Sequence, residues 1–283
     1  MGIGRELHYR EYGAGPPLVI LHGLLGSSGN WHTLASTVFG ERFRVLAVDL
    51  RNHGRSPHTE AISYELLVED LTEFLDAQGI ERTHLLGHSL GGKVAMAFAL
   101  EHPERVDCLV VADMAPRAYP PNHQYILDAL RAVDPASHGS RSDVDAALAE
   151  HISAAPVRQF LLKNLARDAG SGQYRWQMNL KTLYRDYDRL NEAIRADGAI
   201  GDDESPEASG AVGASAAFTG PALFVRGAHS DYVQDSDEEN IRRLFPSAEI
   251  TTIPGAGHWV HADAPQALGE AVTAFLQRPR AGG

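Results

Sequence analysis

Residues 85–92 of the chain read Leu85-Leu86-Gly87-His88-Ser89-Leu90-Gly91-Gly92, and this stretch decides the fold. It follows a short apolar run that begins at Thr83 and leads directly into an Ala-rich helical pattern, so it predicts a strand, a sharp turn and a helix. A serine in such a turn has a strained backbone, and side chains two positions before or after it would clash. Gly87 and Gly91 occupy those two positions. The turn should therefore hold Ser89 exposed at the edge of a sheet.

Short apolar runs alternate with longer helical patterns on both sides of this turn, which predicts a mostly parallel sheet flanked by helices. Several runs are unbroken Val, Leu and Ile segments, as expected of strands that are covered on both faces. The segment from Glu6 to Tyr12 alternates more and predicts a strand near an antiparallel edge. The other predicted strands are 17–21, 43–48, 83–86, 106–112, 222–225 and 250–253, and the predicted helices are 64–78, 90–100 and 266–276.

The alternation stops between the predicted strands 106–112 and 222–225. The intervening chain has helical patterns at 124–132, 143–151, 157–165 and 177–195, and no convincing strand. We therefore expect an α/β core domain formed by residues 1–114 and 219–283, with a helical lid inserted at 115–218. Residues 197–215 are rich in Gly, Ala, Ser and acidic residues without apolar periodicity, which predicts a flexible acidic segment.

The composition fits a soluble globular protein. The 283 residues are 43% hydrophobic and 22% charged, and 37 acidic against 25 basic residues give a net charge of −12. This balance disfavours nucleic acid and anionic membranes as partners. The one cysteine, Cys108, rules out an intramolecular disulfide, and neither a signal peptide nor a membrane-spanning apolar stretch is evident. We expect a cytoplasmic monomer or homodimer that needs no metal and no cofactor.

The turn at Ser89 is typical of a nucleophile, because a helix N-terminus favours the negative charge that develops in its reaction. A nucleophilic serine needs a base. Of the 14 histidines, His258 is the one that both follows the final predicted strand and precedes the final helix. We expect it at the same sheet edge as Ser89. His22, His88 and His261 are expected to pack or to fix the backbone by hydrogen bonds.

Two backbone N–H groups should hold the negative oxygen that forms during this chemistry. One belongs to Leu90, the residue after the nucleophile, and the other to the loop that follows the strand 17–21, where we choose Leu24. Asp49 also ends a strand, but it precedes Ser89 in the chain, and we expect it to fix the loop from Arg51 to Ser56 instead.

Several motifs resemble the α/β-hydrolase superfamily across nearly the whole chain. They are His22-Gly23, Asp49 to Ser56, the serine turn and Gly257-His258-Trp259. More narrowly, residues 51–58, 91–93, 112–116 and 258–263, with the lid segments 160–165 and 176–180, are similar to the YbfF-type esterases. The resemblance implies a carboxylesterase that cleaves small-molecule esters, with acyl thioesters as a further substrate class.

The carboxylate that orients His258 has two candidates. Most α/β-hydrolases place it three residues beyond a glycine after the penultimate strand, but that slot holds Ser230 here, and Asp231 follows it. The YbfF-type proteins resemble this chain in having a serine there and the carboxylate at the end of the preceding strand, which is Asp113. Both strands end at the same sheet edge. We favour Asp113 with Ser230 as an auxiliary hydrogen-bond partner, and Asp231 is the alternative.

The lid is expected to supply an acyl pocket with side chains such as Phe160 and Trp176. Dehalogenases and epoxide hydrolases are disfavoured, because these members of the fold carry an aspartate where Ser89 stands. Carbon–carbon bond hydrolases and cofactor-free haloperoxidases share the serine turn and remain alternatives. A ligand-binding receptor with little turnover is the alternative from a different class.

Overall fold

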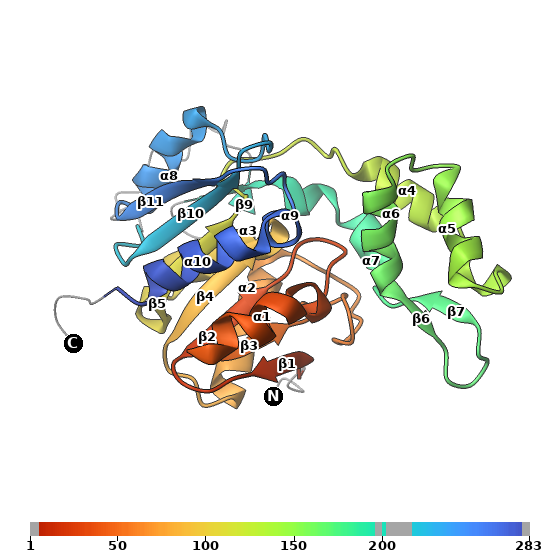
Figure 1. The fold of residues 1–283 in the computed structure, drawn as a ribbon, viewed down its shortest axis with the longest axis horizontal. Helices are drawn as coiled ribbons and strands as arrows, with labels where there is room; N and C mark the ends of the chain where they lie inside the picture. The colour runs from red at the N-terminus through yellow and green to blue at the C-terminus, as the bar shows by residue number, and fades with distance from the viewer. Residues whose placement is uncertain (1–5, 196–199, 202–216, 279–283) are drawn as a thin grey trace.

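A seven-stranded sheet forms the centre of the computed structural model, which describes residues 6–195, 200–201 and 217–278 (Figure 1). Its strand order is β1-β3-β2-β4-β5-β10-β11. The edge strand β1 pairs with β3 in antiparallel fashion, and the other neighbours are parallel, which confirms the predicted sheet. The strands are β1 (Tyr9–Tyr12), β2 (Pro17–Leu21), β3 (Arg44–Val48), β4 (Thr83–His88), β5 (Val106–Ala112), β10 (Ala222–Gly227) and β11 (Ala248–Ile253).

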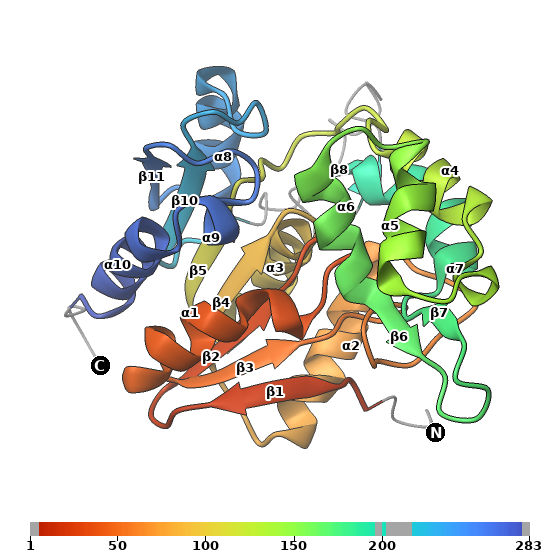
Figure 2. The same ribbon diagram turned by 45° about the vertical axis from the view of Figure 1, so that its right-hand side comes forward.

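Helices cover both faces of this sheet (Figures 1 and 2). Successive side chains of a strand point to opposite faces. An unbroken apolar strand such as β2 therefore contributes side chains to a hydrophobic core on each face of the sheet. Leu18 and Ile20 pack with α1 and α10, and Val19 and Leu21 pack with α2 and α3. The helices around the sheet are α1 (His32–Thr37), α2 (Tyr64–Ala77), α3 (Leu90–Glu101), α8 (Glu238–Leu244), α9 (Val260–Asp263) and α10 (Pro265–Leu276). None of these, nor any other helix in the described ranges, has the length and apolar character needed to cross a membrane.

Between β5 and β10 the chain leaves the sheet and forms a helical insertion beside it (Figures 1 and 2). Its helices are α4 (Gln124–Ala132), α5 (Arg141–Ala149), α6 (Ala155–Leu161) and α7 (Leu180–Arg185). The predicted helix at 177–195 is wrong in its extent, because Asn179 caps α7 and only a short 3₁₀ turn at Asp188–Asn191 follows. The division into a core and a lid stays a prediction.

The prediction that this insertion contains no strand is also wrong. It carries a hairpin of β6 (Leu165–Arg167) and β7 (Tyr174–Trp176), and a second pair of β8 (Ala193–Ile194) and β9 (Ile200–Gly201). Strands of two or three residues are too short to show an alternating pattern in the sequence. Of the predicted flexible segment 197–215, only the two residues of β9 belong to the described part of the chain.

Buried polar contacts fix the long loop that follows β3. The Asp49 carboxylate accepts the backbone N–H of Arg55 at 2.9 Å and that of Ser28 at 2.5 Å, which confirms its expected role in this loop. The Arg51 guanidinium donates twice to the Asp70 carboxylate on α2, with both distances at 2.5 Å. Both side chains of this ion pair are buried. The loop is thereby anchored to the helix that covers one face of the sheet.

We predict that Asp70→Asn lowers the free energy of unfolding by about 3–5 kcal/mol, because it leaves the buried Arg51 charge without its partner. Urea unfolding followed by circular dichroism measures the change. Glu11→Gln, which breaks the exposed pair with Arg44, is the matched control and should cost no more than about 1 kcal/mol. Similar losses in the two variants would contradict the prediction.

Candidate active site

Ser89 lies between β4 and α3 with a backbone φ of 53° and ψ of −118°. Such a conformation is strained for a residue with a side chain, and the close packing around it holds it in place. A Cβ at Gly87 would lie 2.0 Å from the carbonyl oxygen of Gly91, and a Cβ at Gly91 would lie 2.4 Å from that of Leu21. The structure therefore confirms why both positions are glycine.

His258 and Asp113 continue from Ser89 in one hydrogen-bonded series. Ser89 Oγ lies 3.1 Å from His258 Nε2, and His258 Nδ1 lies 2.7 Å from Asp113 Oδ2. His258 stands in the loop between β11 and α9, where His88 Nε2 donates to its carbonyl oxygen at 2.8 Å. The three side chains follow β4, β5 and β11, so the parallel strands bring them to one edge of the sheet.

Asp113 is fully buried and follows β5 directly with a φ of 53°. Its Oδ1 accepts the Gly227 backbone N–H at 2.9 Å, and its Oδ2 accepts the Ser230 hydroxyl in addition to the imidazole. Asp231, the alternative acid, is exposed, and its backbone carbonyl accepts from Arg117 at 3.2 Å. The structure thus brings Asp113 and Ser230 to His258 and leaves Asp231 at the surface.

Leu24 and Leu90, the predicted oxyanion donors, line the same cavity as Ser89. Leu90 is the first residue of α3, and Leu24 lies in a tight turn after β2 in which Leu25 has a φ of 57°. The Asn164 side chain of the insertion donates to the Leu25 carbonyl at 2.6 Å and braces this turn. The role of their backbone N–H groups as oxyanion donors stays a prediction.

The histidines behind Ser89 are buried hydrogen-bonding groups. His22 Nδ1 donates to the Gly23 carbonyl at 2.8 Å, and its Nε2 accepts the Leu50 N–H at 3.0 Å, so the ring is neutral. Burial holds the pKa of His88 well below its ordinary value. These contacts confirm that His22 and His88 fix the backbone. His261 packs on Trp31, with ring centroids 4.9 Å apart, as expected.

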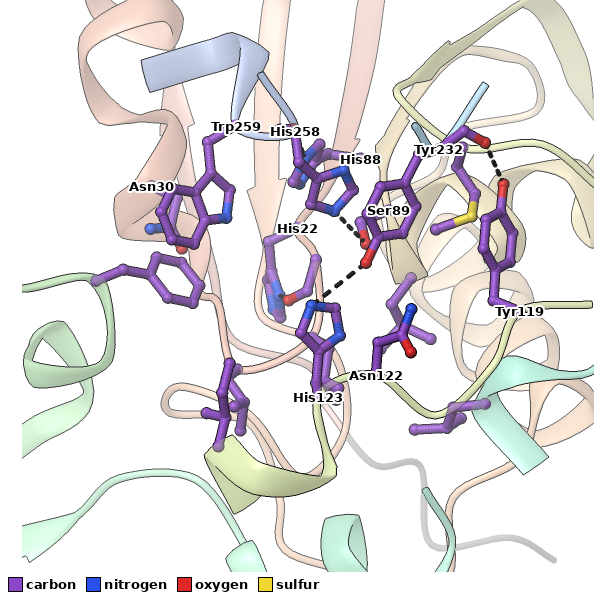
Figure 3. Close-up of a pocket in the computed structure, with 18 of the residues that line it drawn as sticks. His22, Asn30, His88, Ser89, Tyr119, Asn122, His123, Tyr232, His258 and Trp259 are labelled. Carbon is purple, nitrogen blue, oxygen red and sulfur yellow. Dashed lines mark hydrogen bonds between the residues drawn. The ribbon is translucent and has the colours of Figure 1, made fainter. Parts of the chain in front are cut away.

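A cavity of about 410 Å³ lies over Ser89 (Figure 3). Trp259 and Asn30 stand to the left of Ser89 in this view, Tyr119 stands to its right, and Asn122 lies below it. The apolar part of the cavity wall comes from both the core and the insertion. It includes Leu24, Met114, Ile126, Val157, Phe160 and Leu161. A cavity whose surface is mostly apolar, with polar side chains near the reactive atom, suits a substrate with a small apolar acyl part.

Of the two predicted pocket residues, one lines the cavity and the other does not. Phe160 lies on the cavity wall and stacks on Trp259, with ring centroids 5.2 Å apart. Trp176 is not among the residues that line the cavity, and this prediction is corrected. Its indole N–H donates to the carbonyls of Leu130 and Val133, both at 3.2 Å, so it is used in the packing of the insertion itself.

Tyr232 is a site residue that the sequence reasoning missed. Its ring stacks on the His258 imidazole with centroids 3.7 Å apart and an interplanar angle of 17°. Its hydroxyl lies 3.3 Å from Nε2 of His123 in the insertion, and its carbonyl accepts the Tyr119 hydroxyl at 2.5 Å. Burial raises the pKa of Tyr232 to about 12, so the hydroxyl keeps its proton at neutral pH. No local pattern marks these positions, because the contacts join loops more than 100 residues apart in the chain.

Lys93, one turn after Ser89 on α3, is buried in the cavity wall. Its ammonium donates to the Asn191 carbonyl at 3.3 Å and to the Glu192 carbonyl. Burial, together with the nearby charge of Arg117, lowers its pKa to about 7. In the sequence, Lys93 is marked only as part of the family-like segment 91–93. The structure shows that its hydrogen bonds connect the nucleophile helix α3 to the end of the insertion.

Within the described residues, no group of three or more His, Cys, Asp or Glu side chains is arranged to hold a metal ion.

Comparisons with known proteins place these residues in a family context. The sequence model of the alpha/beta hydrolase fold matches residues 16–265. Mouse sn-1-specific diacylglycerol lipase ABHD11 is 40% identical over 269 residues, which cover 92% of this chain and 81% of the relative. The Escherichia coli K12 esterase YbfF is 34% identical over 261 residues, with 92% of both chains covered. A solved marine microorganism esterase is 38% identical with a TM-score of 0.86, covering 96% of this chain and 99% of that one.

We predict that Asp113→Asn lowers kcat by a factor on the order of 10³–10⁴, because the amide no longer holds the imidazole in the tautomer that accepts a proton. Asp231→Asn is the matched control and should change kcat little. Hydrolysis of p-nitrophenyl butyrate by the purified variants measures both. A nearly fully active Asp113→Asn variant beside an inactive Asp231→Asn variant would reverse the assignment.

Tyr232→Leu should lower kcat about three- to tenfold, because it removes the ring that stacks on His258. Tyr232→Phe keeps the stack and should restore most of the lost kcat. Steady-state kinetics separates this positioning role from simple contact with substrate, which would appear in KM. A Tyr232→Leu variant with unchanged kcat and raised KM would show that the stack does not position the imidazole.

Proposed function

The chain belongs to the α/β hydrolase family and is an ester hydrolase, and we propose that it cleaves carboxylic esters through an acyl-enzyme formed on Ser89. The observation that carries this proposal is the hydrogen-bonded series from Ser89 through His258 to Asp113 beneath the 410 Å³ cavity. Relatives that are named esterases and a diacylglycerol lipase support ester bonds as the target. Acyl thioesters can react by the same steps and are included in the proposal.

In the first half of the proposed reaction, Ser89 Oγ attacks the acyl carbonyl while its proton passes to His258 Nε2. The imidazolium that results is stabilised by the buried Asp113 carboxylate, which is held in place by the Gly227 N–H and the Ser230 hydroxyl. The backbone N–H groups of Leu24 and Leu90 receive the negative oxygen. The imidazolium then gives its proton to the leaving alcohol, and the acyl group remains on the serine.

The second half uses the same groups for water. His258 takes a proton from a water molecule that attacks the acyl-enzyme, and it returns this proton to Ser89 as the acid leaves. Tyr232 keeps the imidazole in place through both halves by its stacking contact. The chain's own residues thus make every proton transfer of the scheme.

We further propose that residues 115–218 act as a lid over this reaction. Val157, Phe160 and Leu161 of α6 contribute to the cavity wall together with core residues around Ser89. A lid in this place would shield the cavity from bulk solvent and select substrates by the size of their apolar part. The cytoplasmic location and the monomeric or homodimeric state stay predictions.

A fluorophosphonate probe tests the nucleophile directly. We expect the intact protein to gain one covalent adduct on Ser89, and Ser89→Ala to gain none, because the probe reacts only with an activated serine. Intact-mass and peptide mass spectrometry measure the adduct. Labelling that survives Ser89→Ala, or no labelling of the wild-type protein, would refute the proposal.

A series of p-nitrophenyl esters from acetyl to dodecanoyl then measures turnover and acyl preference. We expect hydrolysis of at least one ester and its loss in Ser89→Ala. A labelled serine without hydrolysis of any ester or thioester would instead favour a carbon–carbon bond hydrolase, a haloperoxidase or a receptor with little turnover.

A further inference from the structure

The part of the cavity next to His258 carries two side chains that are hydrogen-bonded to each other. Tyr232 comes from the core and His123 from the insertion, and both line the cavity over Ser89. The Tyr232 hydroxyl lies 3.3 Å from His123 Nε2, as a dashed line in Figure 3 marks. Among the described residues, this hydroxyl and this imidazole have no other hydrogen-bond partner. We call Tyr232 and His123 the polar pair.

The polar pair holds one proton more than its mutual hydrogen bond uses. The Tyr232 hydroxyl keeps its proton at neutral pH, because burial raises its pKa to about 12. Burial lowers the pKa of His123, and the nearby His258 lowers it further, so its imidazole is neutral and carries one N–H. One of these two donors is used between the two side chains. Whichever direction that hydrogen bond takes, the other donor is left for an acceptor on a ligand in the cavity.

The surrounding packing fixes the place of the polar pair. The His123 backbone N–H donates to the buried Tyr187 hydroxyl at 2.9 Å, and α4 begins at the next residue. The Tyr232 carbonyl accepts the Tyr119 hydroxyl, which itself accepts the Ala115 N–H at 2.8 Å. The two rings of the pair are nearly parallel, with an interplanar angle of 10°. The unused donor therefore has a defined position, as a binding subsite requires.

Asn122, the residue before His123, adds an amide to the same region. It lines the cavity and is exposed, and none of the described residues makes a hydrogen bond to its side chain. In Figure 3, Asn122 and His123 both lie below Ser89. Because an amide can both donate and accept, Asn122 extends the set of hydrogen-bonding groups beside the polar pair.

Another side of the cavity is mainly apolar. Trp259 and Asn30 stand to the left of the serine in Figure 3. Phe160 stacks on Trp259, and Val157, which also lines the cavity, lies about one turn before Phe160 on α6. The side-chain oxygen of Asn30 already accepts a backbone N–H of its own turn at 2.6 Å. This side suits the apolar acyl part of a substrate.

The proton transfer of the proposed reaction assigns the other side to the leaving alcohol. His258 Nε2 gives its proton to the leaving oxygen, so the alcohol must lie next to the imidazole. Tyr232 covers one face of the same imidazole, with ring centroids 3.7 Å apart. The polar pair therefore adjoins the leaving alcohol, and the side of Phe160 and Trp259 is left for the acyl group.

We propose that the polar pair and Asn122 form a subsite for a leaving alcohol that carries a hydrogen-bond acceptor within a few bonds of the ester oxygen. This inference rests on the proposed function and narrows it to esters with an apolar acyl part and a polar alcohol part. A purely alkyl alcohol would cover the unused donor without giving it a partner, which costs free energy. An ether or hydroxyl oxygen at that place would accept from it. The subsite thus selects against alkyl alcohols.

Two butyrate esters of equal length test the subsite in the wild-type protein. 2-Methoxyethyl butyrate differs from butyl butyrate by one ether oxygen, which can only accept. The ratio of their kcat/KM values, divided by the ratio of their hydroxide-catalysed hydrolysis rates, gives the preference that the enzyme adds. We expect a preference for the ether of about three- to tenfold, which corresponds to one net hydrogen bond. 5-Methoxypentyl and heptyl butyrate are the positional control and should give little preference, because their ether oxygen lies far from the ester.

Variants test the count of donors. Tyr232→Phe and His123→Phe each leave one donor in the cavity, so each should keep part of the preference. The double variant has neither donor and should lose the preference. The matched control is the double variant Tyr12→Phe, His32→Phe, which removes an exposed Tyr–His hydrogen bond of 3.1 Å outside the cavity and should keep the wild-type preference. Each variant is judged by a ratio of two substrates, so a general loss of turnover cancels.

Three results would overturn the proposal: no wild-type preference for the 2-methoxyethyl ester, an equal preference in the near and far ether pairs, or full preference in the polar-pair double variant. Circular dichroism and melting curves establish that the variants are folded, and the two wild-type comparisons need no variant. Hydrolysis of neither butyrate, with no fluorophosphonate adduct on Ser89, would contradict the proposed function instead. Hydrolysis of both without preference would contradict only the subsite, so the two failures are distinguishable.

Discussion

Helix α3 approaches β2 and β4 so closely that no side chain fits at Gly87 or Gly91. This contact fixes the direction in which the chain leaves β4, and it forces Ser89 into a conformation that an unconstrained serine rarely adopts. The same contact places the N-terminus of α3 beside the serine oxygen. A change in this packing would move the nucleophile, the amide of Leu90 and the wall of the cavity together.

The sheet brings the constrained serine together with the other two residues of the candidate active site. Ser89, Asp113 and His258 follow three strands that end at the same edge, and each stands in a loop with its own hydrogen bonds. Asp113 has a positive φ like Ser89, which indicates that the loop holds the carboxylate under constraint too. The rigid strands therefore set the distances, and the loops set the orientation of the side chains.

The insertion contacts the same site at several places. Asn164 holds the turn at Leu25, the Asn191 carbonyl accepts from Lys93 on the nucleophile helix, and His123 contacts the tyrosine that stacks on His258. Each contact joins the insertion to a different loop or helix around Ser89.

Local patterns in the sequence were sufficient for the sheet, for the turn at Ser89 and for the choice of His258 as its candidate partner. These predictions depend on apolar runs, on glycine at the two positions beside Ser89 where a side chain would clash, and on the order of motifs along the chain. All of these can be read from the sequence without knowledge of the packing. The question between Asp113 and Asp231 needed the fold, because strand order and loop path decide which carboxylate lies beside an imidazole 145 residues away. The same reason explains why the packing role of Trp176 and the stacking of Tyr232 on His258 could not be predicted from the sequence. A side chain's partners across loops and layers depend on packing between distant segments, and only the tertiary structure determines that packing.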